Sequence, residues 1–182
     1  MRRNIVVGLV GALVVFSPSY SWSQNRPAQP GGAPPDQLAT PRIPPLAESQ
    51  WTDQHRALVR DYAPNGEVGN GLATLLHVPE LVDAIMPFTR FLSQESSLND
   101  RHRALLVLRT AWVAQNQYLW SRFARVARDA GLTNDQIGQV AEGPTANGWS
   151  DFEATLLRLA DELYQNSSVT DATWTTLGIR YN

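Results

Sequence analysis

The reactive side chains of this 182-residue chain limit the chemistry it can perform. The sequence has no cysteine, and all 15 of its basic residues are arginine. The first absence removes disulfides, thiolate nucleophiles, iron–sulfur clusters and Cys-bound zinc. The second removes lysine Schiff bases and the phosphate-binding lysine loop. The three histidines, His55, His77 and His102, lack the spacing of a metal-ligand motif such as HExxH, so we expect neither a metal site nor a cofactor.

Arg109 is the charged residue with the most unusual sequence surroundings. It lies among apolar residues that recur at steps of three, four or seven, the period of a buried helix face: Leu105, Leu108, Trp112, Leu119, Phe123, Val126 and Ala130. Arg109 is therefore a candidate for partial burial, and a buried guanidinium needs a carboxylate partner. Pairing with an internal acid, Asp161 or Glu162, would make it structural, whereas facing a cavity would make it a ligand-binding residue. We favour the structural outcome, although on helix pattern alone both acids are expected at the surface.

Helix signals recur from residue 46 onward without the alternation typical of strands, so residues 46–182 are predicted to form an all-α domain. The expected helices cover residues 48–62, 70–77, 80–94, 134–142, 151–165 and 170–180. Residues 101–130 are expected to form two helices that meet near Asn116, or one kinked helix, ended by Gly131. Four arginines of this segment lie largely off its apolar stripe and are expected on a solvated face, with an anion-holding rim as the alternative: Arg101, Arg122, Arg125 and Arg128.

Helix caps and breaks fix the expected boundaries. Capping boxes begin at Thr133 and Ser150, where a hydroxyl residue is followed three positions later by Gln or Glu. Asn70 and Asp100 are expected to cap two further helices. Pro87 is expected to kink the helix over residues 80–94.

The first 45 residues are predicted to be an export signal and a linker. Residues 5–16 are an apolar run preceded by two arginines, and Ser21 and Ser23 are small residues at positions −3 and −1 of a cut before Gln24. Twelve helical residues span about 18 Å, less than the roughly 30 Å of a bilayer core. We therefore expect cleavage near Ser23 and no lasting membrane anchor. The mature protein is then expected to be periplasmic or secreted. Residues 24–45 contain seven prolines and are expected to be a disordered linker.

Several segments resemble the carboxymuconolactone decarboxylase family: residues 69–81, 105–112, 117–120, 127–133 and 151–163. Together they cover nearly all of residues 46–180. The resemblance implies a helical bundle of the alkylhydroperoxidase D (AhpD)-like type that forms homo-oligomers. Family members usually continue into a further apolar helix, so this bundle is expected to lack the family's last helix.

The family's catalytic motifs are incompletely matched. In its peroxidase branch a Glu, two Cys and two His occupy positions that here are Ala104, Asn116, Leu119, Tyr118 and Phe123, so Cys-dependent peroxidase activity is not expected. Cys-free relatives commonly read Tyr-Glu-Trp-x-x-His at this stretch. Tyr118 and Trp120 match that pattern, whereas Leu119 and Phe123 replace the acid and the histidine. Arg109 matches the family's Leu-Arg.

The resemblance leaves two functions open. An active member would be a lyase acting on a small carboxylated or lactone substrate, bound by Arg109 and Trp120, with Tyr118 as proton donor. The alternative is a non-catalytic binding or assembly protein that keeps the fold. The missing acid, histidine and cysteines favour the second function, and the varied chemistry of the family keeps the first open. The net charge of −2 argues against non-specific nucleic-acid binding.

Overall fold

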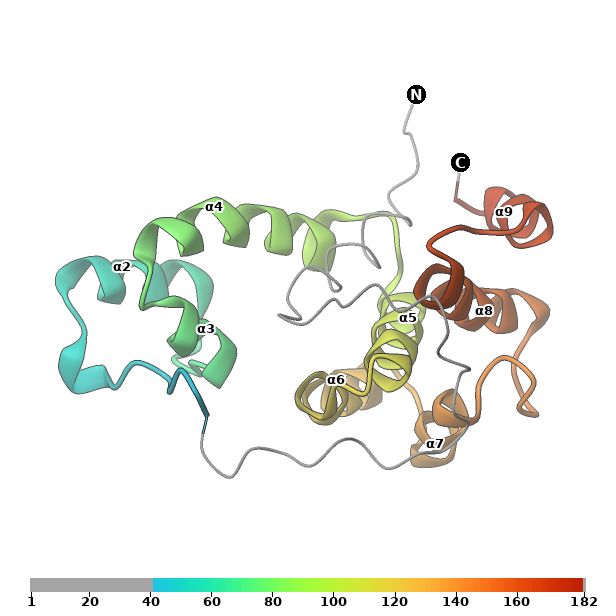
Figure 1. Ribbon diagram of the computed structural model, residues 1–182, viewed down its shortest axis with the longest axis horizontal. Coiled ribbons are helices and arrows are strands. Elements are labelled where there is room, and N and C mark those ends of the chain that lie inside the picture. The colour runs from blue at the N-terminus through green and yellow to red at the C-terminus, as the bar shows by residue number, and fades with distance from the viewer. Residues whose placement is uncertain (1–40, 182) are drawn as a thin grey trace. The chain divides into compact units, whose positions relative to one another are not determined.

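The computed structural model describes residues 41–181, which contain eight α-helices and no strand (Figure 1). The helices are α2 (Asp53–Tyr62), α3 (Asn70–Leu75), α4 (Pro79–Arg90), α5 (Asp100–Val113), α6 (Gln117–Asp129), α7 (Asn134–Glu142), α8 (Asp151–Asn166) and α9 (Asp171–Gly178). A 3₁₀ turn, η1 (Glu48–Gln50), precedes α2, and a π-helical turn, η2 (Phe91–Glu95), follows α4. The all-α prediction is confirmed. The predicted signal peptide and residues 24–40 of the predicted linker lie outside the described residues.

The chain divides into two compact units: residues 36–96, of which 41–96 are described, and the unit that contains residues 97–181. In the first unit α4 packs against α2 and α3 around a small core of Leu58, Leu76 and Val82. Pro87 lies inside α4, and the helix passes into the π-helical turn at Phe91.

Within residues 41–181 no helix combines the length and apolar character needed to cross a bilayer.

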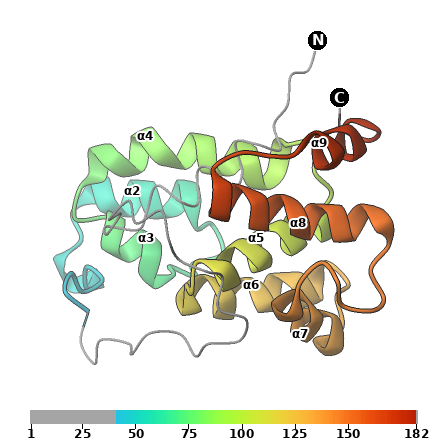
Figure 2. The same ribbon diagram turned by 45° about the vertical axis from the view of Figure 1, so that its right-hand side comes forward.

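In the second unit, α5 is the central helix. Figure 2 shows it between α8 and the pair formed by α6 and α7, and α5 packs against all three. Most of its residues are buried, and they join α6, α7 and α8 in one apolar core: Ala104, Leu105, Leu108, Ala124, Ala127, Leu132, Ile137, Val140 and Leu157. Burial of α5 on several sides explains why Arg109, near its C-terminal end, needs polar partners inside the protein.

The junction between α5 and α6 is a helix stop joined directly to a helix start. Gln115 adopts the left-handed conformation (φ 54°), and the N–H groups of Gln115 and Asn116 bond back to the carbonyls of Trp112 and Ala111, the Schellman pattern. The Asn116 side chain then accepts a hydrogen bond from the Leu119 N–H and caps α6. Of the two predicted arrangements of residues 101–130, two helices meeting near Asn116 is therefore confirmed, and one kinked helix is not.

Other predicted boundaries are confirmed or shifted by a few residues. Gly131 (φ 85°) ends α6 with the same back-bonding pattern, and the capping boxes at Thr133 and Ser150 begin α7 and α8. Two predicted caps are wrong by one residue. Asn99 caps α5 in place of Asp100, because its backbone is extended and its side chain reaches the His102 N–H. Similarly, Gly69 precedes α3, and Asn70 is its first helical residue.

Candidate functional site

Arg109 is held by the protein on several sides. Its Nε and Nη2 donate to the two carboxylate oxygens of Asp161 on α8, at 2.6 and 3.0 Å. Its Nη1 donates to the carbonyls of Val140 and Ala141 at 2.9 and 2.8 Å, near the C-terminal end of α7. The side chains of Arg109 and Asp161 are only 11% and 15% exposed. The guanidinium thus joins α5, α7 and α8, and four of its five N–H groups are used in doing so.

Pairing with an internal acid is the outcome we favoured for Arg109, and the geometry shows it. The expectation that Asp161 lies at the surface is wrong, because Asp161 is the partner that a buried guanidinium requires. Gly143, just after α7, completes the enclosure: a Cβ added there would lie 2.9 Å from Arg109 Nη2. The backbone at Gly143 has φ 108°, a conformation that residues with side chains rarely adopt. A role for Arg109 in substrate binding stays a prediction.

The other two predicted site residues lie on α6. Trp120 packs against the apolar core and against Trp112, with ring centroids 5.2 Å apart. Tyr118 is 43% exposed. Phe123, at the position where Cys-free relatives carry a histidine, also packs against the core. Substrate binding by Trp120 and proton donation by Tyr118 stay predictions.

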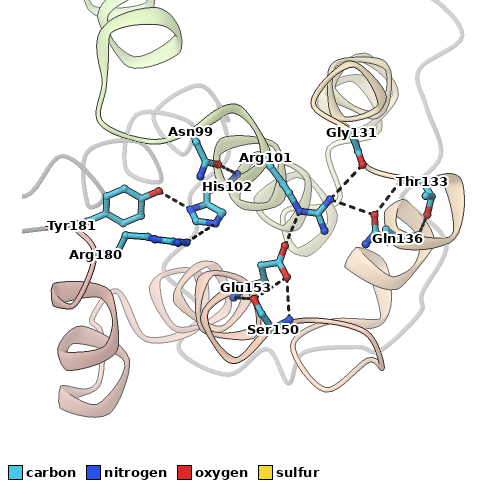
Figure 3. Close-up of polar contacts among 10 residues, drawn as sticks. All are labelled: Asn99, Arg101, His102, Gly131, Thr133, Gln136, Ser150, Glu153, Arg180 and Tyr181. Atoms are coloured by element: carbon cyan, nitrogen blue, oxygen red, sulfur yellow. Dashed lines mark hydrogen bonds and ion pairs between the residues drawn. The ribbon is translucent and has the colours of Figure 1, made fainter.

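A polar cluster at the N-terminal ends of α5 and α8 was not predicted from the sequence (Figure 3). Glu153, which is 8% exposed, accepts hydrogen bonds from Arg101 Nε at 2.7 Å and from the Ser150 hydroxyl at 2.8 Å. Arg101 Nη1 also approaches the side-chain oxygen of Gln136 on α7, at 3.3 Å. The side chain of Arg101 is therefore partly buried and bonded to Glu153 and Gln136, in contrast to the solvated face on which we expected it.

His102 lies beside this cluster and is 5% exposed. Its Nδ1 lies 2.6 Å from the Tyr181 hydroxyl oxygen, and its Nε2 lies 3.4 Å from Arg180 Nη1. Because a guanidinium can only donate, Nε2 must be the acceptor. The neutral ring then carries its proton on Nδ1 and donates it to Tyr181. Phe152 on α8 packs on the same ring, with centroids 5.2 Å apart.

Electrostatics fix the protonation states in this cluster. Burial lowers the pKa of His102, and the charge of Arg180 lowers it further. Burial raises the pKa of the Tyr181 hydroxyl. For Glu153, burial alone would raise the pKa, but hydrogen bonds from Ser150 and Arg101 outweigh burial, and the net pKa is lowered. At neutral pH the cluster therefore holds an ionised carboxylate, a neutral imidazole and a neutral phenol.

Sequence reasoning could find only part of this cluster. The capping box at Ser150 does predict that Glu153 turns back toward the start of α8. Nothing in the sequence links His102 to Tyr181, because the two residues are 79 positions apart and are brought together only by the packing of the last residues onto α5. Within the described part of the chain, no group of three or more His, Asp or Glu side chains is placed to hold a metal ion.

Comparison with known proteins finds a family match for part of the chain. Residues 79–162, from α4 to most of α8, match the model of the carboxymuconolactone decarboxylase family. No curated protein matches the chain. No solved structure matches it either. The matched region contains Arg109, Tyr118 and Trp120, the site residues predicted from the sequence. Residues 79–162 therefore form a carboxymuconolactone decarboxylase family domain of the all-α, AhpD-like type, in a chain without any cysteine.

Proposed function

We propose that this chain is a non-catalytic family member, exported and self-associating, which acts as a binding or assembly protein. The observation that carries the proposal is the enclosure of Arg109 by Asp161 and the end of α7. The charged residue that matches the family pattern is thereby occupied in holding three helices together. The family's acid and histidine positions are Leu119 and Phe123, neither of which can transfer a proton.

An exposed apolar stripe on the first unit supports self-association. Along α4 and the first residue of η2, four exposed residues follow the spacing three, four, three: Leu81, Ala84, Phe88 and Phe91. Leu81, Phe88 and Phe91 are 39%, 50% and 38% exposed. This is the spacing with which two helices pack along a seam, and Ala84 leaves room for a large side chain opposite it. We propose a second copy of the chain as the partner, because such a seam can pair with itself.

The sedimentation mass of the mature chain tests the assembly proposal. Phe88→Asp places a charge in the stripe and should convert the wild-type oligomer to monomer. Val126→Asp is the matched control, since Val126 is similarly exposed, at 42%, but lies on α6, and it should leave the mass unchanged. A wild type that is monomeric at all concentrations would overturn the proposal, and so would equal dissociation of the two variants.

Export is the second part of the proposal, and residues 1–23 support it. The mature protein should begin at or near Gln24 and be recovered from the soluble periplasmic or secreted fraction. Sequencing of the N-terminus of protein expressed in its full-length form tests this. Retention of Met1 or Arg2 would contradict it.

A lyase acting on a small carboxylated or lactone substrate is the second candidate function. The pair of His102 and Tyr181 favours it, because a neutral imidazole bonded to a phenol is a proton-transferring arrangement. Turnover of a panel of lactones and carboxylates would establish the activity. Loss of turnover in Tyr181→Phe would then assign the reaction to this pair, whereas loss in Tyr118→Phe would assign it to the site predicted from the family motif.

A further inference from the structure

The last described residues of the chain contact α5 and α8 around the imidazole of His102. His102 holds Tyr181 through Nδ1 at 2.6 Å and Arg180 through Nε2 at 3.4 Å (Figure 3). The guanidinium of Arg180 also lies over the Phe152 ring, 5.1 Å from its centroid. Ile179, just before this pair, is 82% exposed and supplies little packing. Apart from backbone hydrogen bonds to Leu177 on α9 and a hydrogen bond between the Tyr181 side chain and the Asn99 backbone, the contacts of this segment are made with His102 and Phe152.

The contact with Arg180 requires the imidazole to be neutral, whereas the Nδ1–H group can donate to Tyr181 in either protonation state. A proton added at Nε2 would replace the acceptor that faces Arg180 with a second donor and would set two positive charges about one hydrogen-bond length apart. Arginine cannot relieve this repulsion by losing its own proton. The ring is almost fully buried, so an added charge is poorly solvated while the segment stays in place.

The charged residues around the His102 ring have opposite effects on its protonation. Arg180, from the segment after α9, and Arg101, on α5 itself, oppose protonation of His102. Glu153 on α8 favours it, but this carboxylate is already bonded to Arg101 and Ser150. The charge of Arg103 on α5 acts to lower the pKa of Tyr181, and Arg103 also forms an ion pair with Asp100. No carboxylate among residues 41–181 forms an ion pair with Arg180.

We propose that His102 is an acid-sensitive latch: protonation of its ring repels Arg180, and the cost of the buried charge favours a state in which residues 180 and 181 leave α5 and α8 and uncover Phe152. The closed state binds the neutral ring, and the open state lets the ring take up a proton in water. Acidification therefore shifts the equilibrium toward the open state by mass action. The latch is independent of the proposed assembly through α4, because it needs no residue of that helix.

Hydrogen exchange of the mature protein, followed in peptides that cover residues 170–181, measures the opening. With the released histidine titrating near its ordinary pKa of about 6.5, the open fraction should rise up to about tenfold between pH 7.5 and pH 5.5, after correction for the intrinsic pH dependence of exchange. His102→Gln should abolish this rise. His77→Gln is the matched control, since His77 is exposed and bonds the Pro44 carbonyl in the other unit, and it should preserve the rise.

A second variant keeps the test decisive if His102→Gln does not fold. Arg180→Met removes the facing charge, so the imidazole should titrate at higher pH by NMR and the acid-induced rise in exchange should shrink. The latch is refuted if exchange in the wild-type segment does not change between the two pH values. It is also refuted if the rise persists in His102→Gln, or if Arg180→Met leaves the titration of His102 unaltered.

Discussion

Replacing Arg109 by methionine tests most directly how this domain is held together. The substitution keeps an unbranched side chain of similar length but removes the guanidinium. Asp161 would lose both of its hydrogen bonds from Arg109, and the carbonyls of Val140 and Ala141 would lose their shared donor. The perturbation is therefore a buried carboxylate left without its counter-charge at the meeting point of α5, α7 and α8.

The size of the effect follows from burial. Removing one partner of a buried ion pair lowers stability by about 3–5 kcal/mol. Asp161 keeps 15% of its side chain exposed, so water can solvate it in part, and we expect the lower end, about 3 kcal/mol. The double variant Arg109→Met with Asp161→Leu removes both charges and should be more stable than Arg109→Met alone.

Denaturant unfolding of the mature chain at pH 7 is the assay. Arg122→Met serves as the control, because Arg122 is exposed on α6, and it should change stability by no more than about 0.5 kcal/mol. A loss of less than about 1 kcal/mol in Arg109→Met would refute the structural role. Melting curves with a panel of aromatic and lactone carboxylates add a second readout. A carboxylate-dependent rise in the wild type that vanishes in Arg109→Met would show that this arginine binds ligand.

Four further outcomes are expected from unfolding measurements at pH 7 unless stated. Gly143→Ala should lower stability by at least about 2 kcal/mol, because φ 108° and the contact with Arg109 both exclude a Cβ; an unchanged midpoint would contradict this. Gln115→Gly should raise stability by about 0.5–1 kcal/mol, since glycine adopts the left-handed conformation without strain, and a loss would count against the strain argument. Thr110→Val should raise stability by about 1 kcal/mol, because the buried Thr110 hydroxyl has no hydrogen-bond partner in the described structure; a loss would indicate a partner. The lowered pKa of Glu153 contributes stability that is present above pH 4.5 and is lost as pH falls through the pKa of Glu153 in the folded state. Glu153→Gln should therefore flatten the acid limb of a stability–pH curve. An unchanged limb would contradict the lowered pKa of Glu153.

Local signals predicted the helices well because caps act over three or four residues. Thr133 and Ser150 each bond the N–H three positions on, and Asn116 does the same at the junction of α5 and α6. The one-residue error at the start of α5 has the same origin. Asn99 and Asp100 are both good capping residues, and only the extended backbone of Asn99 decides between them.

The polar clusters could not be predicted to the same degree because they depend on tertiary packing. The partial burial of Arg109 and its pairing with an acid were predictable, since a guanidinium in an apolar stretch requires a counter-charge. The choice of Asp161 over Glu162 depends on which face of α8 turns toward α5. Glu162 instead accepts hydrogen bonds from Thr170 and Thr173 and fastens the start of α9. The pairing of His102 with Tyr181 had no sequence signal.

These contacts explain how a domain of this family can keep Arg109 while other positions of the family motif are replaced. Arg109 matches the family's Leu-Arg, yet its donors bind the carboxylate of Asp161 and the end of α7. Replacing Arg109 would lower the free energy of unfolding whether or not a substrate is ever bound, so the need for a stable fold is enough to retain it. Leu119 and Phe123, which stand where relatives carry an acid and a histidine, have no such structural requirement to be polar, and Phe123 packs against the core. Retention of the arginine together with replacement of the proton-transferring residues is therefore the pattern expected when a fold is preserved for binding or assembly.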